Sequence, residues 1–208
     1  MEVIQKYFSD FTNEQVVQFA ALKEQYTLWN ARINVISRKD IDNFYTHHVL
    51  HSLAIAAKFN FENLQAMDLG TGGGFPGIPL AILFPNATFH LADSINKKLQ
   101  VVKAIAGEIG LNNITTQHTR AEEIKNRQFD VVVSRAVAPL KDLWFWSKPV
   151  IRKNKNLQEG VPNGLLCLKG GDLSKEIFES GCKPFVWEVD KIFPEEYFKD
   201  KFLLYQPR

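Results

Sequence analysis

The sequence predicts an α/β fold with a mostly parallel, seven-stranded sheet, an antiparallel hairpin at one sheet edge and a helical extension in front of the sheet. Up to about residue 60, apolar residues recur every three or four positions, as on one face of a helix. From Leu64 onward, short apolar runs alternate with helical stretches, which is typical of βαβ units. Further on, two strand-like segments lie too close together for a helix between them, so they are expected to pair antiparallel.

Residues 1–60 form the predicted helical extension. Thr12 followed by Gln15 matches a capping box at the start of its first helix. The apolar face of that helix is formed by Phe11, Val16, Phe19, Leu22, Tyr26 and Trp29. A second helix is expected from about Asp40 to Phe59.

Residues 61–208 form the predicted main domain. Strands are expected at residues 64–69, 87–92, 114–118, 129–134 and 164–168, with helices between them. The hairpin is expected from residues 185–193 and 201–207. A chain of 208 residues has room for one domain with an extension, but not for two catalytic domains.

The composition excludes several classes of protein. With 45% hydrophobic and 23% charged residues, the chain is typical of a globular protein rather than a disordered one. It shows neither a long apolar run nor a basic, then apolar, start, so a cytoplasmic protein without a membrane span is expected. Cys167 and Cys182 lack CxxC spacing and are interpreted as reduced, structural thiols. The net charge of +2 neither requires nor excludes an RNA partner.

The most informative segment is MDLGTGGGFPGIPLAIL, residues 67–83. A predicted strand ends at Asp68 and Leu69, and Gly70, Gly72 and Gly74 then form a tight loop that opens a helix. Glycines let the backbone approach a ligand closely and adopt conformations that other residues avoid. The loop therefore predicts a site for a nucleotide cofactor.

The glycine loop alone leaves two cofactors open. Gly72, Gly74 and Gly77 satisfy the GxGxxG pattern of dinucleotide sites. A register that begins at Gly70, after a predicted strand whose penultimate residue is the acid Asp68, instead resembles that of class I, S-adenosylmethionine-dependent methyltransferases. Asp93, at the end of the second predicted strand, is suited to ribose hydroxyls in both classes or to capping the next helix.

Several motifs, taken in order, resemble one family. The segments DLGTGGGFPGIPLAI, LADSINKK, TRAEE, FDVVVSRAVAPL and CLKGG resemble ribosomal RNA small subunit methyltransferase G, also called glucose-inhibited division protein B. In the extension, residues 34–37 and 48–53 look like further segments of that family. One departure is His51, because the family commonly has Asp at this position.

The resemblance implies a Rossmann-like, class I methyltransferase fold. It also implies an enzyme that transfers a methyl group from S-adenosyl-L-methionine to N7 of a guanine in 16S ribosomal RNA of the small subunit. Guanine N7 has a lone pair and no proton, so catalysis requires alignment rather than a general base, and no catalytic residue is expected. The resemblance places Gly70, Phe75, Ala121, Glu122 and Arg135 at the cofactor, and the residue-level reasoning adds Asp68, Gly72, Gly74 and Asp93.

Basic residues supply the candidate RNA contacts. They are Arg32, Arg38, Lys39, Arg135, Lys148, Arg152, Lys153, Lys155 and Lys169. Phe75 or Trp144 are candidates for stacking on the target base. His47, His48 and His51 share helical spacing, but no further ligand completes a metal site, and no metal is expected. We expect a monomer. Two alternative functions remain at this stage: an NAD(P)-dependent oxidoreductase and a non-catalytic RNA-binding module on a methyltransferase-like fold.

Overall fold

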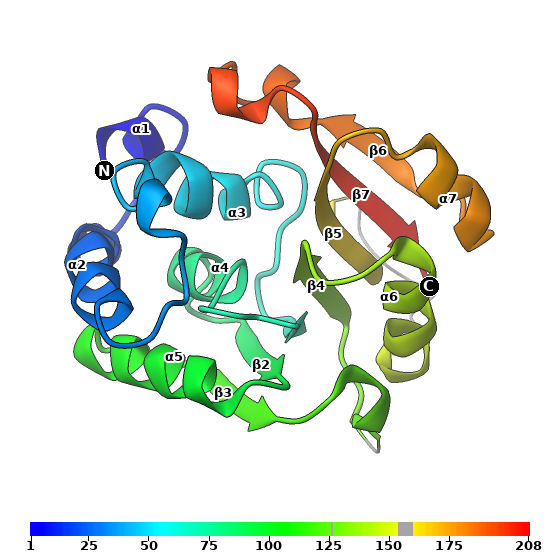
Figure 1. Ribbon diagram of the computed structural model, residues 1–208, viewed down its shortest axis with the longest axis horizontal. Coiled ribbons are helices and arrows are strands. Elements are labelled where there is room, and N and C mark those ends of the chain that lie inside the picture. Colours follow the sequence, from blue (N-terminus) through cyan, green and yellow to red (C-terminus); the bar gives the residue numbers. More distant parts are fainter. Residues whose placement is uncertain (126, 154–159) are drawn as a thin grey trace.

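A twisted sheet forms the centre of the computed structural model, which describes residues 1–125, 127–153 and 160–208 (Figure 1). Among these residues the sheet has seven strands in the order β3-β2-β1-β4-β5-β7-β6. The strands are β1 (Gln65–Leu69), β2 (Thr88–Asp93), β3 (Ile114–His118), β4 (Val131–Arg135), β5 (Gly164–Gly170), β6 (Phe185–Glu188) and β7 (Lys201–Pro207). Strands β1 to β5 are parallel to one another, and β7 runs antiparallel to both β5 and β6. The predicted α/β fold class, with its antiparallel hairpin at one edge, is confirmed.

Helices cover both faces of the sheet. They are α1 (Glu2–Gln5), α2 (Asn13–Asn30), α3 (His51–Leu53), α4 (Gly77–Leu83), α5 (Asn96–Glu108), α6 (Leu140–Ser147) and α7 (Ser174–Ser180). Figure 1 shows the blue and cyan N-terminal helices on the same side as α4 and α5, and α6 and α7 on the other side. Alternate residues of the strands serve the two faces, since Val131 and Val133 join one apolar cluster and Val132 joins the other.

The helical extension shares its apolar core with the sheet. Helix α2 begins with the predicted capping box, in which Thr12 Oγ1 accepts from Gln15 N and the Gln15 side chain accepts from Thr12 N. Its buried side chains, including Phe19, Leu22 and Tyr26, belong to the same cluster as Val101 and Ile105 of α5. The extension therefore buries apolar surface that α4 and α5 would otherwise expose to water.

The second predicted helix of the extension, over residues 40–59, is broken into shorter pieces. A π-helical turn (Tyr45–Leu50) leads into the three-residue helix α3. The carbonyl oxygen of His48 accepts hydrogen bonds from Ser52 Oγ at 2.7 Å and from Arg135 Nη1 at 3.4 Å. The backbone N of His51 also donates to the carbonyl oxygen of His48 and to that of Thr46, five residues earlier. Turns with such π-type bonds are frequent at functional sites.

Short 3-10 turns complete the described structure. They span Arg38–Asp40, Ala121–Glu123, Lys148–Val150, Val189–Lys191 and Glu196–Phe198. Strand β6 is shorter than the predicted segment 185–193, because the chain turns into the 3-10 turn after Glu188. Within the described ranges, no helix is both long and apolar enough to cross a membrane.

Candidate active site

A cavity of about 660 Å³ lies at the carboxyl ends of β1, β2 and β4. Strand β1 pairs with β2 on one side and with β4 on the other, so the strand order reverses here. In open α/β sheets, ligands bind at this reversal point. The cavity also has the size typical of small-molecule sites, about 300–1,000 Å³. Of the residues predicted at the cofactor, seven line it: Gly70, Gly72, Phe75, Asp93, Ala121, Glu122 and Arg135.

Asp93 ties two loops of this cavity together. Its side chain comes from the carboxyl end of β2 and is largely buried. Oδ2 accepts a hydrogen bond from Gly72 N at 2.8 Å, and Oδ1 accepts one from Ile95 N at 2.8 Å. A carboxylate has about four acceptor positions, so Asp93 retains capacity to accept from ligand hydroxyls in the cavity.

The glycine loop needs glycine at Gly70 and Gly74 for steric reasons. Gly70 has a φ of 71°, and a Cβ there would lie 2.5 Å from Cγ2 of Val137. Gly74 has a φ of 100°, and a Cβ there would lie 2.6 Å from Cδ1 of Ile78. Gly74 does not line the cavity, so the structure places this predicted cofactor residue inside the loop. At Gly72 the backbone faces open space, because a Cβ would meet nothing within 4 Å.

Asp68 lies beneath the loop rather than in the cavity wall. It is fully buried, and its Oδ2 accepts from Thr71 Oγ1 at 2.6 Å and from Gly77 N at 2.8 Å. Oδ1 has no hydrogen-bond partner in the part of the chain that the structure describes. Burial raises the pKa of Asp68 to about 7, although the two hydrogen bonds and the Arg135 charge favour the ionised form. In the structure, Asp68 therefore holds the two ends of the glycine loop.

Arg135 joins the sheet to the extension. From the end of β4, its Nη1 donates to the carbonyl oxygens of His47 and His48 at 3.3 and 3.4 Å, and its Nη2 contacts His48 Nδ1 at 3.1 Å. Its guanidinium lies over the Phe75 ring, 4.8 Å from the ring centroid. Phe75 is only 3% exposed, so its face holds Arg135 and is not open for stacking on a base.

The candidate RNA contacts occupy different parts of the molecule. Arg32, Arg38, Lys39, Lys148 and Lys153 are exposed, whereas Lys155 lies outside the described residues. Lys169 is largely covered, pairs with Glu176 at 2.7 Å and donates to the carbonyl oxygen of Ala138. Its charge is therefore matched within the protein.

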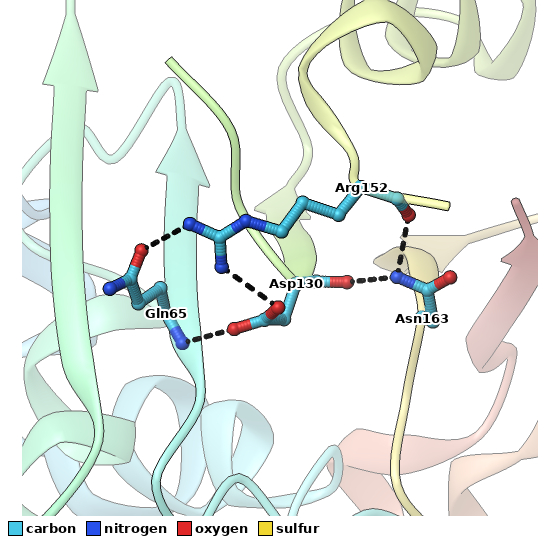
Figure 2. A network of polar contacts seen from close by, with 4 residues as sticks. All are labelled: Gln65, Asp130, Arg152 and Asn163. Carbon is cyan, nitrogen blue, oxygen red and sulfur yellow. Dashed lines mark hydrogen bonds and ion pairs between the residues drawn. The ribbon is translucent and has the colours of Figure 1, made fainter. Parts of the chain in front are cut away.

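Arg152 belongs to a polar network at the amino ends of the strands, the edge opposite the cavity (Figure 2). Its Nη1 pairs with Asp130 Oδ1 at 2.9 Å, and its Nη2 donates to Gln65 Oε1 at 2.6 Å. Asn163 Nδ2 donates to the carbonyl oxygens of Asp130 and Arg152. The network links the starts of β1, β4 and β5, which gives Arg152 a structural role and places it away from the predicted site.

Several cavity residues were not predicted from the sequence. They are Val35, Ser94, Ile95, Lys98, Thr119, Val137 and Trp146. Ser94 directly follows β2, and Thr119 directly follows β3. Because both positions lie at the carboxyl ends of predicted strands, the sequence could have indicated these two residues. Val35 and Trp146 reach the cavity through tertiary packing and left no local pattern.

The three histidines of the extension have separate partners. His47 Nδ1 pairs with Asp40 at 3.1 Å, His48 contacts Arg135, and His51 packs edge-on against Phe198. Among the described residues, no group of three His, Cys, Asp or Glu side chains could hold a metal ion.

Comparisons with known proteins agree with this geometry. The family model for rRNA small subunit methyltransferase G matches residues 13–195. A protein of that name from Phocaeicola vulgatus is 55% identical over 208 residues, covering 99% of this chain and 97% of its own. A relative from Cytophaga hutchinsonii with the same name is 48% identical, covering 100% and 99%.

Solved structures show the same fold at low sequence identity. A SAM-dependent methyltransferase from Aquifex aeolicus superposes with a TM-score of 0.57 at 14% identity, covering 82% of this chain and 98% of its own. A fibrillarin pre-rRNA processing protein from Methanococcus jannaschii gives a TM-score of 0.55 at 11% identity, covering 76% of each chain. The solved structures show the fold, whereas the family model and the named relatives favour a methyltransferase over the oxidoreductase alternative. With the match over residues 13–195 and relatives above 50% identity, the chain belongs to the rRNA small subunit methyltransferase G family.

Proposed function

We propose that this protein transfers a methyl group from S-adenosyl-L-methionine to N7 of a guanine in 16S ribosomal RNA of the small subunit. Family membership supports the reaction class and the RNA substrate. The observation that carries the proposal is the cavity at the β1/β4 reversal point, where the glycine loop and Asp93 meet. Action on the ribosomal subunit implies a cytoplasmic enzyme, and we propose that it acts as a monomer.

The residues of this cavity fit S-adenosylmethionine. Asp93 would accept hydrogen bonds from the ribose hydroxyls, and the chain around Ala121 and Glu122 would border the adenine. The loop from Gly70 to Gly72 would lie along the methionine part, since its backbone faces open space at Gly72. The predicted cofactor residues in the cavity wall come from the ends of four strands, β1 to β4, so the fold itself brings them together.

The proposed reaction needs alignment more than acid–base chemistry. When bound, S-adenosylmethionine supplies a methyl group on a positively charged sulfur. The lone pair of guanine N7 forms the new bond to the methyl carbon as the carbon–sulfur bond breaks and its electron pair stays on sulfur. No proton leaves N7, so the reaction requires no general base. The protein contributes by holding the reactants in line, which is worth about 7–11 kcal/mol in favourable cases.

The direct test combines methyl transfer with cofactor binding. We expect labelled methyl from S-adenosylmethionine to enter small subunits isolated without this modification, at guanine N7. Asp93→Asn keeps the size of the side chain but leaves one acceptor oxygen for the two backbone amides that Asp93 binds. We therefore expect the affinity for S-adenosylhomocysteine to fall at least about tenfold. Asp42→Asn, on the exposed surface of the extension, is the matched control and should bind normally.

The possible failures separate the parts of the proposal. Normal cofactor binding without methyl incorporation would refute the RNA substrate. Binding of NADH in place of S-adenosylmethionine would refute the cofactor and restore the oxidoreductase alternative. RNA binding without affinity for either cofactor would indicate the non-catalytic module.

A further inference from the structure

A second cavity, of about 540 Å³, lies directly beside the proposed cofactor cavity. The two cavities share Arg135, Ala136 and Val137 in their walls. The second cavity is bounded by the π-helical turn of the extension, the carboxyl end of β5 and the start of β7. A group bound there would thus be next to the cofactor on the side open to a substrate.

The charges of this second cavity do not balance. Its charged side chains are Arg135, Lys169, Lys201 and Glu176. Lys169 and Glu176 neutralise each other at 2.7 Å. Neither Arg135 nor Lys201 takes part in an ion pair with any of the residues described by the structure. The Lys201 ammonium lies over the Tyr197 ring, 5.4 Å from its centroid.

Of the three histidines in the wall, His47 pairs with Asp40, and the other two add no compensating charge. His48 Nδ1 faces Nη2 of Arg135, an obligate donor, so the ring is neutral with its proton on Nε2. Burial, reinforced by Arg135, lowers the pKa of His48 to about 3. His51 is 6% exposed, and burial followed by the charges of Arg135 and Lys201 lowers its pKa well below the usual value. A carboxylate at position 51 would add a negative charge near these two cations, whereas a neutral imidazole leaves both without an ion pair.

The position of Lys201 depends on Gly170 of the neighbouring strand. The two residues are paired across β5 and β7. A Cβ at Gly170 would lie 3.1 Å from Nζ of Lys201 and 3.2 Å from its Cδ, so the lysine side chain runs across the space that glycine leaves open. The ammonium is therefore positioned at the cavity by packing against Gly170 and by its contact with the Tyr197 ring.

We propose that the second cavity is a phosphate site, in which Lys201 and Arg135 hold a backbone phosphate of the RNA beside the nucleotide that is methylated. The identity of the RNA rests on the proposed function, whereas the phosphate chemistry rests on the cavity. Two uncompensated cations suit an anion, and a phosphodiester is the anion that every RNA nucleotide supplies. Arg135, shared by both cavities, would then set the distance between this phosphate and the cofactor.

The first experiment compares a ligand with and without its phosphate. The protein, saturated with S-adenosylhomocysteine, is titrated by calorimetry with GMP and with guanosine. We expect GMP to bind about tenfold tighter, as a charge-assisted contact provides. Lys201→Gln should remove most of that preference, and Lys201→Arg should keep it. Lys199→Gln is the matched control, because Lys199 is an exposed lysine two residues away that pairs with Glu196, and it should behave as the wild type.

The second experiment uses the substrate. Binding to unmodified small subunits is measured against salt concentration, and Lys201→Gln should lower the slope of log K against log salt by about one, the value for one lost phosphate contact. Gly170→Ala displaces the ammonium without removing it, so it should also reduce the preference for GMP. The affinity for S-adenosylhomocysteine should not change in either variant. Unchanged affinity would also show that both variants are folded.

Three results would overturn the phosphate site. The first is equal affinity for GMP and guanosine. The second is an equal loss of the preference for GMP in Lys201→Gln and Lys199→Gln. The third is binding of inorganic phosphate as tight as that of GMP, which would identify free phosphate as the ligand. The proposed function fails separately, if wild-type protein methylates no subunit RNA while the preference for GMP persists.

Discussion

Replacing Asp68 by Asn should make the protein's stability less sensitive to pH. The Asp68 carboxyl is fully buried, and burial raises its pKa from the usual 3.8 to about 7. Between about pH 4 and pH 7 the folded protein holds this proton whereas the unfolded chain has released it. Stability therefore falls as the pH rises through that interval, and above it the loss stays constant.

The size of the effect follows from the two pKa values. The step from 3.8 to about 7 corresponds to roughly 4 kcal/mol, at about 1.4 kcal/mol per pH unit. Of this, roughly 2–3 kcal/mol is lost between pH 5 and pH 8. Asp68→Asn has no charge to gain over this range and keeps an acceptor for the Thr71 and Gly77 donors.

The assay is thermal unfolding of both proteins without cofactor at pH 5 and pH 8. For a chain of this length, 1 kcal/mol shifts Tm by about 2–4 °C. We expect Tm of the Asn variant, relative to that of the wild type, to rise by roughly 5–10 °C from pH 5 to pH 8. Taking the difference between the two proteins cancels the other titrating groups. A difference that is the same at both pH values would refute the argument that burial keeps Asp68 protonated.

Three further outcomes are expected. Gly70→Ala should lower stability by about 1–3 kcal/mol, because its Cβ meets Val137 at a positive φ; adding Val137→Ala should restore part of the lost Tm. Arg152→Ala should lower Tm, because it removes the ion pair with Asp130, but should leave binding to the small subunit unchanged; weaker binding would indicate that Arg152 contacts RNA. Burial raises the pKa of the Cys167 thiol to about 12, so a thiol reagent at pH 8 should label Cys182 alone in the folded protein.

The sequence predicted the sheet well because its signals are local. The apolar runs of β1, β4 and β5 and the loop between β1 and α4 can be recognised without knowing their neighbours. All five predicted parallel strands are present, and the predicted hairpin forms the β6/β7 edge. Seven of the nine predicted cofactor residues line one cavity, because parallel strands bring their carboxyl ends to one edge.

The failures of prediction concern contacts between distant segments. The helix expected over residues 40–59 is interrupted where Arg135, from another part of the chain, donates to its carbonyl oxygens. The RNA contacts of Arg152 and Lys169 stay predictions, but their ion pairs with Asp130 and Glu176 had no signal in the sequence because the partners come from other segments. Lys201 had no distinguishing sequence context, since its role depends on Gly170 and on cations contributed by other strands.

The insertion of β7 between β5 and β6 has a consequence for biosynthesis. Residues are made in order, and 37 residues separate the end of β5 at Gly170 from the end of β7 at Pro207. At a synthesis rate of about 5–20 residues per second, the far edge of β5 stays unpaired for about 2–7 s after that strand has emerged. That edge carries Leu165, Leu166 and Leu168, which are buried in the finished sheet. During translation the nascent chain thus has an unpaired strand edge that can pair with other chains. Such an edge is a target for chaperones, and stalled synthesis at this stage would favour aggregation.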